Sequence, residues 1–359
     1  MKIVDRFEVS YYQYLDEQSQ LSEDAPSLAR DWPKLIELYR LMVLARMMDA
    51  KAIRLQRTGM LGTYPSTRGQ EAVFVGAGYA TAKTDIFVPY YRDMAAVMQR
   101  GVSLSQILLY WGGDERGNIF QSTSDDFPFS VPVGSQPLHA AGAAFAIKYK
   151  KESRAVVAMC GDGATSEGDF YEAMNVAGIW KLPVVFIVCN NQWAISVPRS
   201  AQTAAHTLAQ KAIAAGFEGE QVDGNDIIAV VHRMQEALKE AREHHTPRLL
   251  ELICYRQHDH TTADDASRYE PKDLRDAAWQ HEPIMRLRKF LAANNVLSET
   301  EEQALAADCT DKINTAVAEY QATSPQSADA LFDYLYKTLP SCYAEQRLQL
   351  INEVERGKP

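Results

Sequence analysis

The chain has 359 residues, 46% of them hydrophobic and 23% charged, which is ordinary for a soluble globular protein with a large core. Its formal net charge of −10 argues against a nucleic-acid-binding surface, because phosphate backbones are bound by clustered Lys and Arg. The five cysteines form no Cys-x-x-Cys pair, the amino terminus lacks the apolar core of a signal peptide, and no run of about eighteen apolar residues occurs. We therefore expect a cytoplasmic protein of bacterial type, with no nucleic-acid partner and no membrane segment.

The amino-terminal part is predicted to be an arm followed by two helices. Residues 1–33 are polar and Tyr-rich with little periodicity, so we expect an arm that lies on another surface. Apolar residues then recur at helical spacing over 34–56, and Pro33 suits the first turn of that helix. A second helix, small and containing glycine, is expected over 70–80.

Two hydrophobic runs of strand length follow in the middle of the chain. They cover 155–160 and 182–189, are too short to span a membrane, and end at Gly or Asn. Such runs are typical of buried parallel strands. The segment 169–180 between them is helix-like, as a parallel connection requires.

The remaining elements complete an α/β pattern. An amphipathic helix is expected over 226–245 and a strand over 248–255. Alternating strands and helices predict a mostly parallel sheet flanked by helices, which we assign to an α/β domain over 34–270. Residues 271–359 show helical patterning with few glycines, and we expect them to form a carboxyl-terminal helical extension.

Polar motifs stand directly after both central strands. Gly161-Asp162-Gly163 follows the first strand and Asn190-Asn191 follows the second, so both motifs lie at carboxyl strand ends, where open α/β sheets bind ligands. The Asp162 carboxylate, the Asn191 amide oxygen and a nearby carbonyl are hard ligands that suit Mg²⁺ or Ca²⁺. The flanking glycines and the following helix start favour a phosphate. A Gly-Asp-Gly alone is usually a turn, but this context predicts a metal-diphosphate site.

The order of these elements resembles the thiamine diphosphate enzymes. More closely, GDGATSEGDFYEAMNVAGIWKLPVVFIVCNNQWAIS is similar to the α subunit of the decarboxylating first component of 2-oxo acid dehydrogenase complexes. The resemblance extends from about Leu35 to Tyr269. It implies the diphosphate-binding type of the thiamine diphosphate fold, with thiamine diphosphate and Mg²⁺ as cofactors.

The resemblance also implies roles for individual residues. The metal ligands would be Asp162, Asn191 and the carbonyl of Trp193. The residues expected to bind the cofactor are Tyr91, Arg92, Val131, Val133, Asp162, Gly163, Ala164, Asn191, Ile195 and His260. Among them, the Tyr-Arg pair contacts the diphosphate, the two valines bracket the aminopyrimidine, and Ile195 props the bent cofactor.

Simpler explanations exist for three of these residues or segments. Arg92 could form a surface salt bridge with Asp93, the loop 131–137 could be a turn shaped by proline, and Ile195 could be ordinary core packing. His139 is tempting as an acid or base, but it could simply pack against the sheet, and its role stays open.

A loop after the last strand carries the expected catalytic residue. Matching the family pattern places the catalytic histidine at His260, since a histidine titrating near neutrality can stabilise an oxyanion and serve in acyl transfer. A zinc site is the weaker interpretation, because the His spacing lacks supporting ligands. His258 and Asp259 depart from the family pattern, and we assign no regulation to Thr261.

The resemblance implies an acyl-transferring 2-oxo acid dehydrogenase. The stretch QRTGMLGTYPSTRGQEA is similar to bacterial pyruvate-type subunits, so pyruvate is the expected substrate, with branched-chain 2-oxo acids and acetoin as alternatives. A non-catalytic scaffold with the same fold is an alternative of another class. A nicotinamide dehydrogenase is disfavoured because Ser166 stands where its third glycine would be.

The predicted site is half a site. Thiamine enzymes need a Glu beside the aminopyrimidine, carried on a separate α/β domain, and the residues after 270 are too few and too poor in strands for one. We therefore expect a β subunit to supply it, in an α₂β₂ heterotetramer. The resemblance adds a lipoyl-bearing dihydrolipoyl acyltransferase as acyl acceptor.

Overall fold

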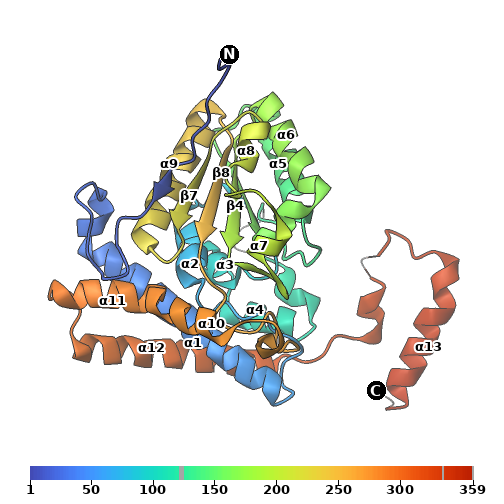
Figure 1. The fold of residues 1–359 in the computed structure, drawn as a ribbon. Coiled ribbons are helices and arrows are strands. Elements are labelled where there is room, and N and C mark those ends of the chain that lie inside the picture. The colour runs from blue at the N-terminus through green and yellow to red at the C-terminus, as the bar shows by residue number, and fades with distance from the viewer. Residues whose placement is uncertain (121–124, 334, 358–359) are drawn as a thin grey trace. The chain divides into compact units, whose positions relative to one another are not determined.

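A computed structural model describes residues 1–120, 125–333 and 335–357 of the protein (Figure 1). In these residues the chain forms two compact units, Met1–Val317 and Ala318–Pro359. The three-part division expected from the sequence stays a prediction. No helix in the described ranges is both long and apolar enough to cross a membrane.

The first unit is built on a six-stranded parallel sheet with the order β1-β7-β8-β4-β3-β2. Its strands are β1 (Tyr11–Tyr12), β2 (Ile86–Val88), β3 (Val156–Gly161), β4 (Val184–Asn190), β7 (Gly219–Asp223) and β8 (Arg248–Ile253). A small antiparallel hairpin follows β4 and consists of β5 (Trp193–Ala194) and β6 (Val197–Pro198). The predicted α/β class with a mostly parallel sheet is confirmed.

Helices cover both faces of the sheet, as Figure 1 shows. The helices before the last strand are α1 (Trp32–Arg57), α2 (Glu71–Ala80), α3 (Met94–Arg100), α4 (Leu104–Trp111), α5 (Ser135–Lys150), α6 (Gly168–Trp180), α7 (Arg199–Gln202), α8 (Lys211–Ala214) and α9 (Ile227–His244). Those after it are α10 (Lys272–Ala278), α11 (Pro283–Ala293), α12 (Glu299–Ala322) and α13 (Ala344–Glu355). The carboxyl-terminal part is therefore helical, as predicted.

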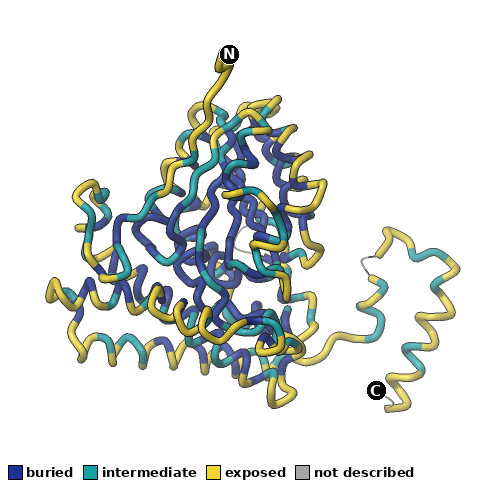
Figure 2. Tube along the Cα trace, in the orientation of Figure 1, coloured by how far each residue is buried: buried dark blue, intermediate teal, exposed yellow. Residues whose placement is uncertain are grey.

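The sheet is buried on both faces, which explains the continuous hydrophobic runs in its strands (Figure 2). In β3, the side chains of Val156, Ala158 and Cys160 pack into the cluster formed with α5 and α6. Val157 and Met159 alternate with them and are equally buried, on the opposite face. The central strands are thereby fixed in position, and so are the polar motifs that follow them.

The amino-terminal arm packs on its own chain. Tyr11 and Tyr12 form β1, which pairs with β7 and covers one edge of the sheet. The buried carboxylate of Asp226 then accepts the backbone N–H groups of Tyr14 and Leu15, at 2.7 and 2.8 Å. The arm is therefore part of the first unit.

Candidate functional site

The site lies at the carboxyl ends of β2, β3, β4 and β8. Gly161 at the end of β3 pairs with Cys189 of β4, so Asp162 leaves the sheet beside Asn190, the last residue of β4. A cavity of about 230 Å³ opens at this edge. Every residue predicted from the sequence to bind the cofactor or the metal lines this cavity, although these residues come from separate segments.

The Asp162 carboxylate is buried without a full set of partners. Asp162 begins a short 3₁₀ turn after β3 and is 1% exposed, and its Oδ2 has no hydrogen-bond partner among the described residues. Burial raises the pKa of this carboxyl from 3.8 to about 6. A bound cation would supply the missing partner and remove this penalty.

Any metal here must be held mainly by oxygen atoms. Among the described residues there is no group of three or more His, Cys, Asp or Glu side chains able to hold a metal, so His258 and His260 belong to no such group. The cavity instead offers the Asp162 carboxylate, the Asn191 amide and the Trp193 carbonyl. One carboxylate with neutral oxygens suits Mg²⁺ when phosphate oxygens complete its coordination.

The turn after Asn191 is strained and close to the 3₁₀ turn. Ile195 has φ of +57° and its side chain is 55% exposed, which is unusual for a β-branched residue and does not fit core packing. A Cβ at Gly163 would lie 2.9 Å from the Cβ of Ala194, so glycine permits this approach. Backbone strain of this kind clusters at binding sites.

The loop before α5 presents two valines to the cavity. Val131 and Val133 are 52% and 55% exposed. Below them the buried amide of Gln136 donates to the carbonyl of Ser130 at 2.9 Å and fixes the loop. The loop is thus held by its own hydrogen bonds while its apolar side chains stay uncovered.

Arg92 is a buried residue that holds the loop carrying His260. Its Nη1 donates to the carbonyl of Ser66 at 2.6 Å, and its Nη2 contacts the carbonyl and the Nδ1 of His260 at 3.0 and 3.1 Å. Asp93 is also buried and accepts the backbone N–H of Tyr90. The alternative of a surface salt bridge between Arg92 and Asp93 is therefore not observed. Within the part of the chain that the structure describes, Arg92 Nε has no hydrogen-bond partner and can donate to a ligand.

The contact with Arg92 fixes the state of His260. A guanidinium can only donate, so Nδ1 accepts and the neutral ring carries its proton on Nε2. Burial, together with Arg92 and Arg256, lowers the pKa of His260 from 6.5 to about 3. The expected titration near neutrality is thus wrong for the cofactor-free protein, in which His260 is a neutral hydrogen-bond donor.

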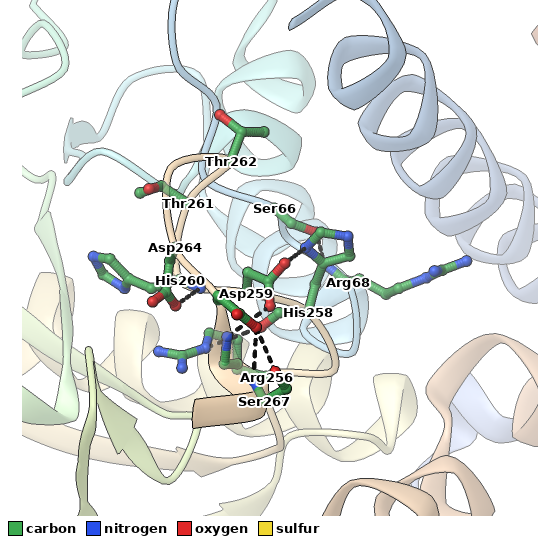
Figure 3. Close-up of polar contacts among 12 residues, drawn as sticks. Ser66, Arg68, Arg256, His258, Asp259, His260, Thr261, Thr262, Asp264 and Ser267 are labelled. Atoms are coloured by element: carbon green, nitrogen blue, oxygen red, sulfur yellow. Dashed lines mark hydrogen bonds and ion pairs between the residues drawn. The ribbon is translucent and has the colours of Figure 1, made fainter. Parts of the chain in front are cut away.

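A fully buried arginine with no role predicted from the sequence connects the two halves of the site. Arg256 donates to the carbonyl of Ile195 at 2.9 Å and to the hydroxyl of Tyr269 at 2.8 Å. Tyr269 donates to Asp264, which accepts the backbone N–H of His260 at 2.8 Å. Figure 3 shows this loop with Arg256 at its base. Arg256 stands three residues after the end of β8, at the carboxyl edge of the sheet, and this position in the sequence could have marked it as a site residue.

The other singled-out residues lie outside the cavity. His139 is exposed on α5, with its ring 5.9 Å from that of Phe127. His258 is mostly buried, burial lowers its pKa, and its Nδ1 lies 3.9 Å from Asp259. Asp259 accepts the backbone N–H of Ala266 and so stabilises the loop itself.

Comparison with known proteins identifies the family. The profile described as "Dehydrogenase E1 component" matches residues 39–329. The chain belongs to the dehydrogenase E1 component family. The resemblance found in the sequence is confirmed, and membership of this family implies thiamine diphosphate as cofactor.

Three relatives within the E1 family match nearly the whole chain, and each is named "Pyruvate dehydrogenase E1 component subunit alpha". The protein from Mycoplasma genitalium is 37% identical over 345 residues, which cover 96% of both chains. That from Mycoplasma pneumoniae is 36% identical over 347 residues, 97% of both chains. That from Staphylococcus aureus strain Mu50 is 39% identical over 338 residues, 93% of this chain and 90% of the relative.

Proposed function

We propose that this chain is the α subunit of a pyruvate dehydrogenase E1 component that works with a β subunit as an α₂β₂ heterotetramer. It decarboxylates pyruvate with thiamine diphosphate and Mg²⁺, and passes the acetyl group to the lipoyl group of a dihydrolipoyl acyltransferase. One observation carries the proposal: residues from separate segments, each expected to bind cofactor or metal, line the same cavity. The names of the relatives support pyruvate as the substrate.

The residues present fit a divalent cation bound to a diphosphate. Asp162 Oδ2 is buried and lacks a partner in the described ranges, and Asn191 and the Trp193 carbonyl offer further oxygens in the same cavity. For the phosphates, Arg92 offers its free Nε–H, Tyr91 lies next to it, and the backbone at Gly163 and Ala164 opens the turn that leads into α6.

When bound, thiamine diphosphate supplies the electron sink for loss of CO₂ from a 2-oxo acid. The contributions of this chain are binding, orientation and hydrogen bonding. Ile195, Val131 and Val133 give apolar surfaces that hold the ring system and exclude water. Neutral His260 donates its Nε2–H to an oxygen of the substrate, and its Nδ1 cannot accept a proton while Arg92 occupies it.

A β subunit is needed to complete the cavity. A volume of about 230 Å³ is below the roughly 300–1,000 Å³ of ligand pockets that enclose a molecule. Large apolar side chains are also exposed on α5 and α6, among them Phe145, Tyr149, Ile179 and Trp180, and such surfaces mark protein contacts.

The five cysteines form no disulfide, which agrees with a bacterial-type cytoplasm.

The decisive experiment measures steady-state turnover, as the reduction of an artificial electron acceptor, by the chain alone and together with its β subunit. Pyruvate, 3-methyl-2-oxobutanoate and acetoin are compared as substrates in the presence of thiamine diphosphate and Mg²⁺. We expect negligible activity without the β subunit and the highest kcat/KM for pyruvate. Full activity of the chain alone would refute the half-site argument, and absent activity with the partner would favour a non-catalytic scaffold.

A further inference from the structure

A buried glutamine outside the recognised motifs contacts one of the proposed metal ligands. Gln70 is fully buried at the start of α2, and its Oε1 accepts from Asn191 Nδ2 at 2.8 Å. The thiol of Cys189 donates to the same oxygen at 3.4 Å. The two amides are 121 residues apart in the sequence, and Gln70 is not among the residues proposed to bind the cofactor or the metal.

The hydrogen bonds around Asn191 allow only one orientation of its amide. Asn191 Oδ1 accepts the backbone N–H of Trp193 at 3.2 Å. A backbone N–H can only donate, so the oxygen must face Trp193 and the NH₂ group must face Gln70. Gln70 must then present its own oxygen. The atom of Asn191 that can bind a cation is thereby directed to the side of Trp193, which lines the cavity.

The backbone turn before α2 places Gln70 beside Asn191. Gly69 has φ of +85°, and a Cβ there would lie 2.3 Å from the carbonyl oxygen of Tyr255. Only glycine permits this approach of α2 to the segment after β8. Glu71 accepts the backbone N–H of Gly69 at 3.0 Å and pairs with Arg46, which fixes the turn.

We propose that Gln70 is a positioning residue that holds the Asn191 carboxamide with its oxygen available to the divalent cation. The inference rests on the proposed Mg²⁺-diphosphate site. Without the Gln70 oxygen, the NH₂ group of Asn191 is a buried donor without a partner, and the amide is free to turn. Hydrogen-bond partners of metal ligands typically contribute about 10- to 100-fold to metal affinity.

The substitution Gln70→Met tests this role of Gln70 selectively. Gln70 Nε2 has no hydrogen-bond partner among the described residues, so the substitution removes only the contacts of Oε1 with Asn191 and Cys189. Gln257→Met is the matched control. Gln257 is also buried, its Nε2 donates to the carbonyl of Ala278 at 3.1 Å, and it does not line the cavity.

The experiment titrates thiamine diphosphate by calorimetry into the complex of this chain with its β subunit, at a series of Mg²⁺ concentrations. We expect Gln70→Met to need about 10- to 100-fold more Mg²⁺ for half-maximal binding, and Gln257→Met to need the same as the wild type. In the Asn191→Ala background, Gln70→Met should add no further loss, because it acts through Asn191.

The outcomes separate this inference from the function on which it rests. If the wild-type complex binds no thiamine diphosphate, or binds it without a divalent cation, the proposed function fails. If the wild type needs Mg²⁺ and Gln70→Met needs the same concentration, the inference about Gln70 is overturned. Equal losses in Gln70→Met and Gln257→Met, or additive losses with Asn191→Ala, would also overturn it.

Discussion

Replacing the Asp162 carboxylate should stabilise the cofactor-free protein while it removes metal binding. In the absence of a cation, burial raises the pKa of Asp162 from 3.8 to about 6. One pKa unit corresponds to about 1.4 kcal/mol, so keeping this carboxylate ionised at pH 7.5 costs the folded state about 3 kcal/mol. Asp162→Asn keeps the shape of the side chain and removes this cost.

The effect of Asp162→Asn on stability should depend on pH. The folded-state pKa lies above the unfolded one, so the folded wild-type protein is favoured below about pH 3.8 and loses this stability as the pH rises through about 6. We expect Asp162→Asn to have a higher Tm than the wild type at pH 7.5 and an equal Tm near pH 4. Mg²⁺ with thiamine diphosphate should raise the Tm of the wild-type complex and leave that of the variant unchanged.

Asp226→Asn is the matched control, because Asp226 is equally buried and has a pKa raised to about 6 by burial. Its two oxygens accept the backbone N–H groups of Tyr14, Leu15 and Ile228, so an amide in its place leaves donors unpaired. These unpaired donors cost the folded state about 1–3 kcal/mol. That cost offsets the gain from removing the buried charge, so Asp226→Asn should show no rise in Tm at pH 7.5. A cofactor-free Asp162→Asn protein that is less stable than the wild type at pH 7.5, or that binds the cofactor with unchanged Mg²⁺ dependence, would refute the reasoning.

Three further predictions concern His260 and the residues that hold its loop. Arg92→Lys keeps the charge but cannot donate to Ser66 and His260 together, so the Kd for thiamine diphosphate should rise about tenfold by calorimetry; an unchanged Kd would contradict this role. Tyr269→Phe removes the link from Arg256 to Asp264, and should lower kcat in steady-state assays without changing cofactor affinity; the reverse pattern would disprove it. Burial lowers the pKa of His260, so the folded state favours the neutral ring. The stability that this gives the cofactor-free protein is fully present above about pH 6.5 and is lost as the pH falls toward 3. Between pH 7.5 and 5, the free energy of unfolding measured in urea should therefore fall less for His260→Gln than for the wild type. An equal fall in both proteins would contradict this prediction.

The parts of the site that follow from local signals were predictable from the sequence. Asp162 and Asn191 each stand directly after a hydrophobic strand, and neighbouring parallel strands bring their carboxyl ends together. The meeting of distant motifs at one cavity is a consequence of this rule. The loop that carries His260 also follows a strand, β8, which pairs with β4.

The parts that depend on long-range contacts were not predictable in the same way. Gln70 meets Asn191 across 121 residues, and nothing in its own segment marks that contact. The low pKa of His260 depends on its burial beside Arg92 and Arg256, which only the folded chain brings together. The pairing of Tyr11 and Tyr12 with β7 likewise depends on an edge left open by the rest of the sheet.

The central claim is that a divalent cation held between Asp162 and Asn191 secures the diphosphate of the cofactor. A crystal structure of the complex with the β subunit, grown with thiamine diphosphate and Mg²⁺, tests it most directly. We predict a metal ion about 2.1 Å from oxygen atoms of Asp162 and Asn191, with the diphosphate beside Arg92. Cofactor density elsewhere, or a diphosphate bound here with no metal at these two side chains, would contradict the account.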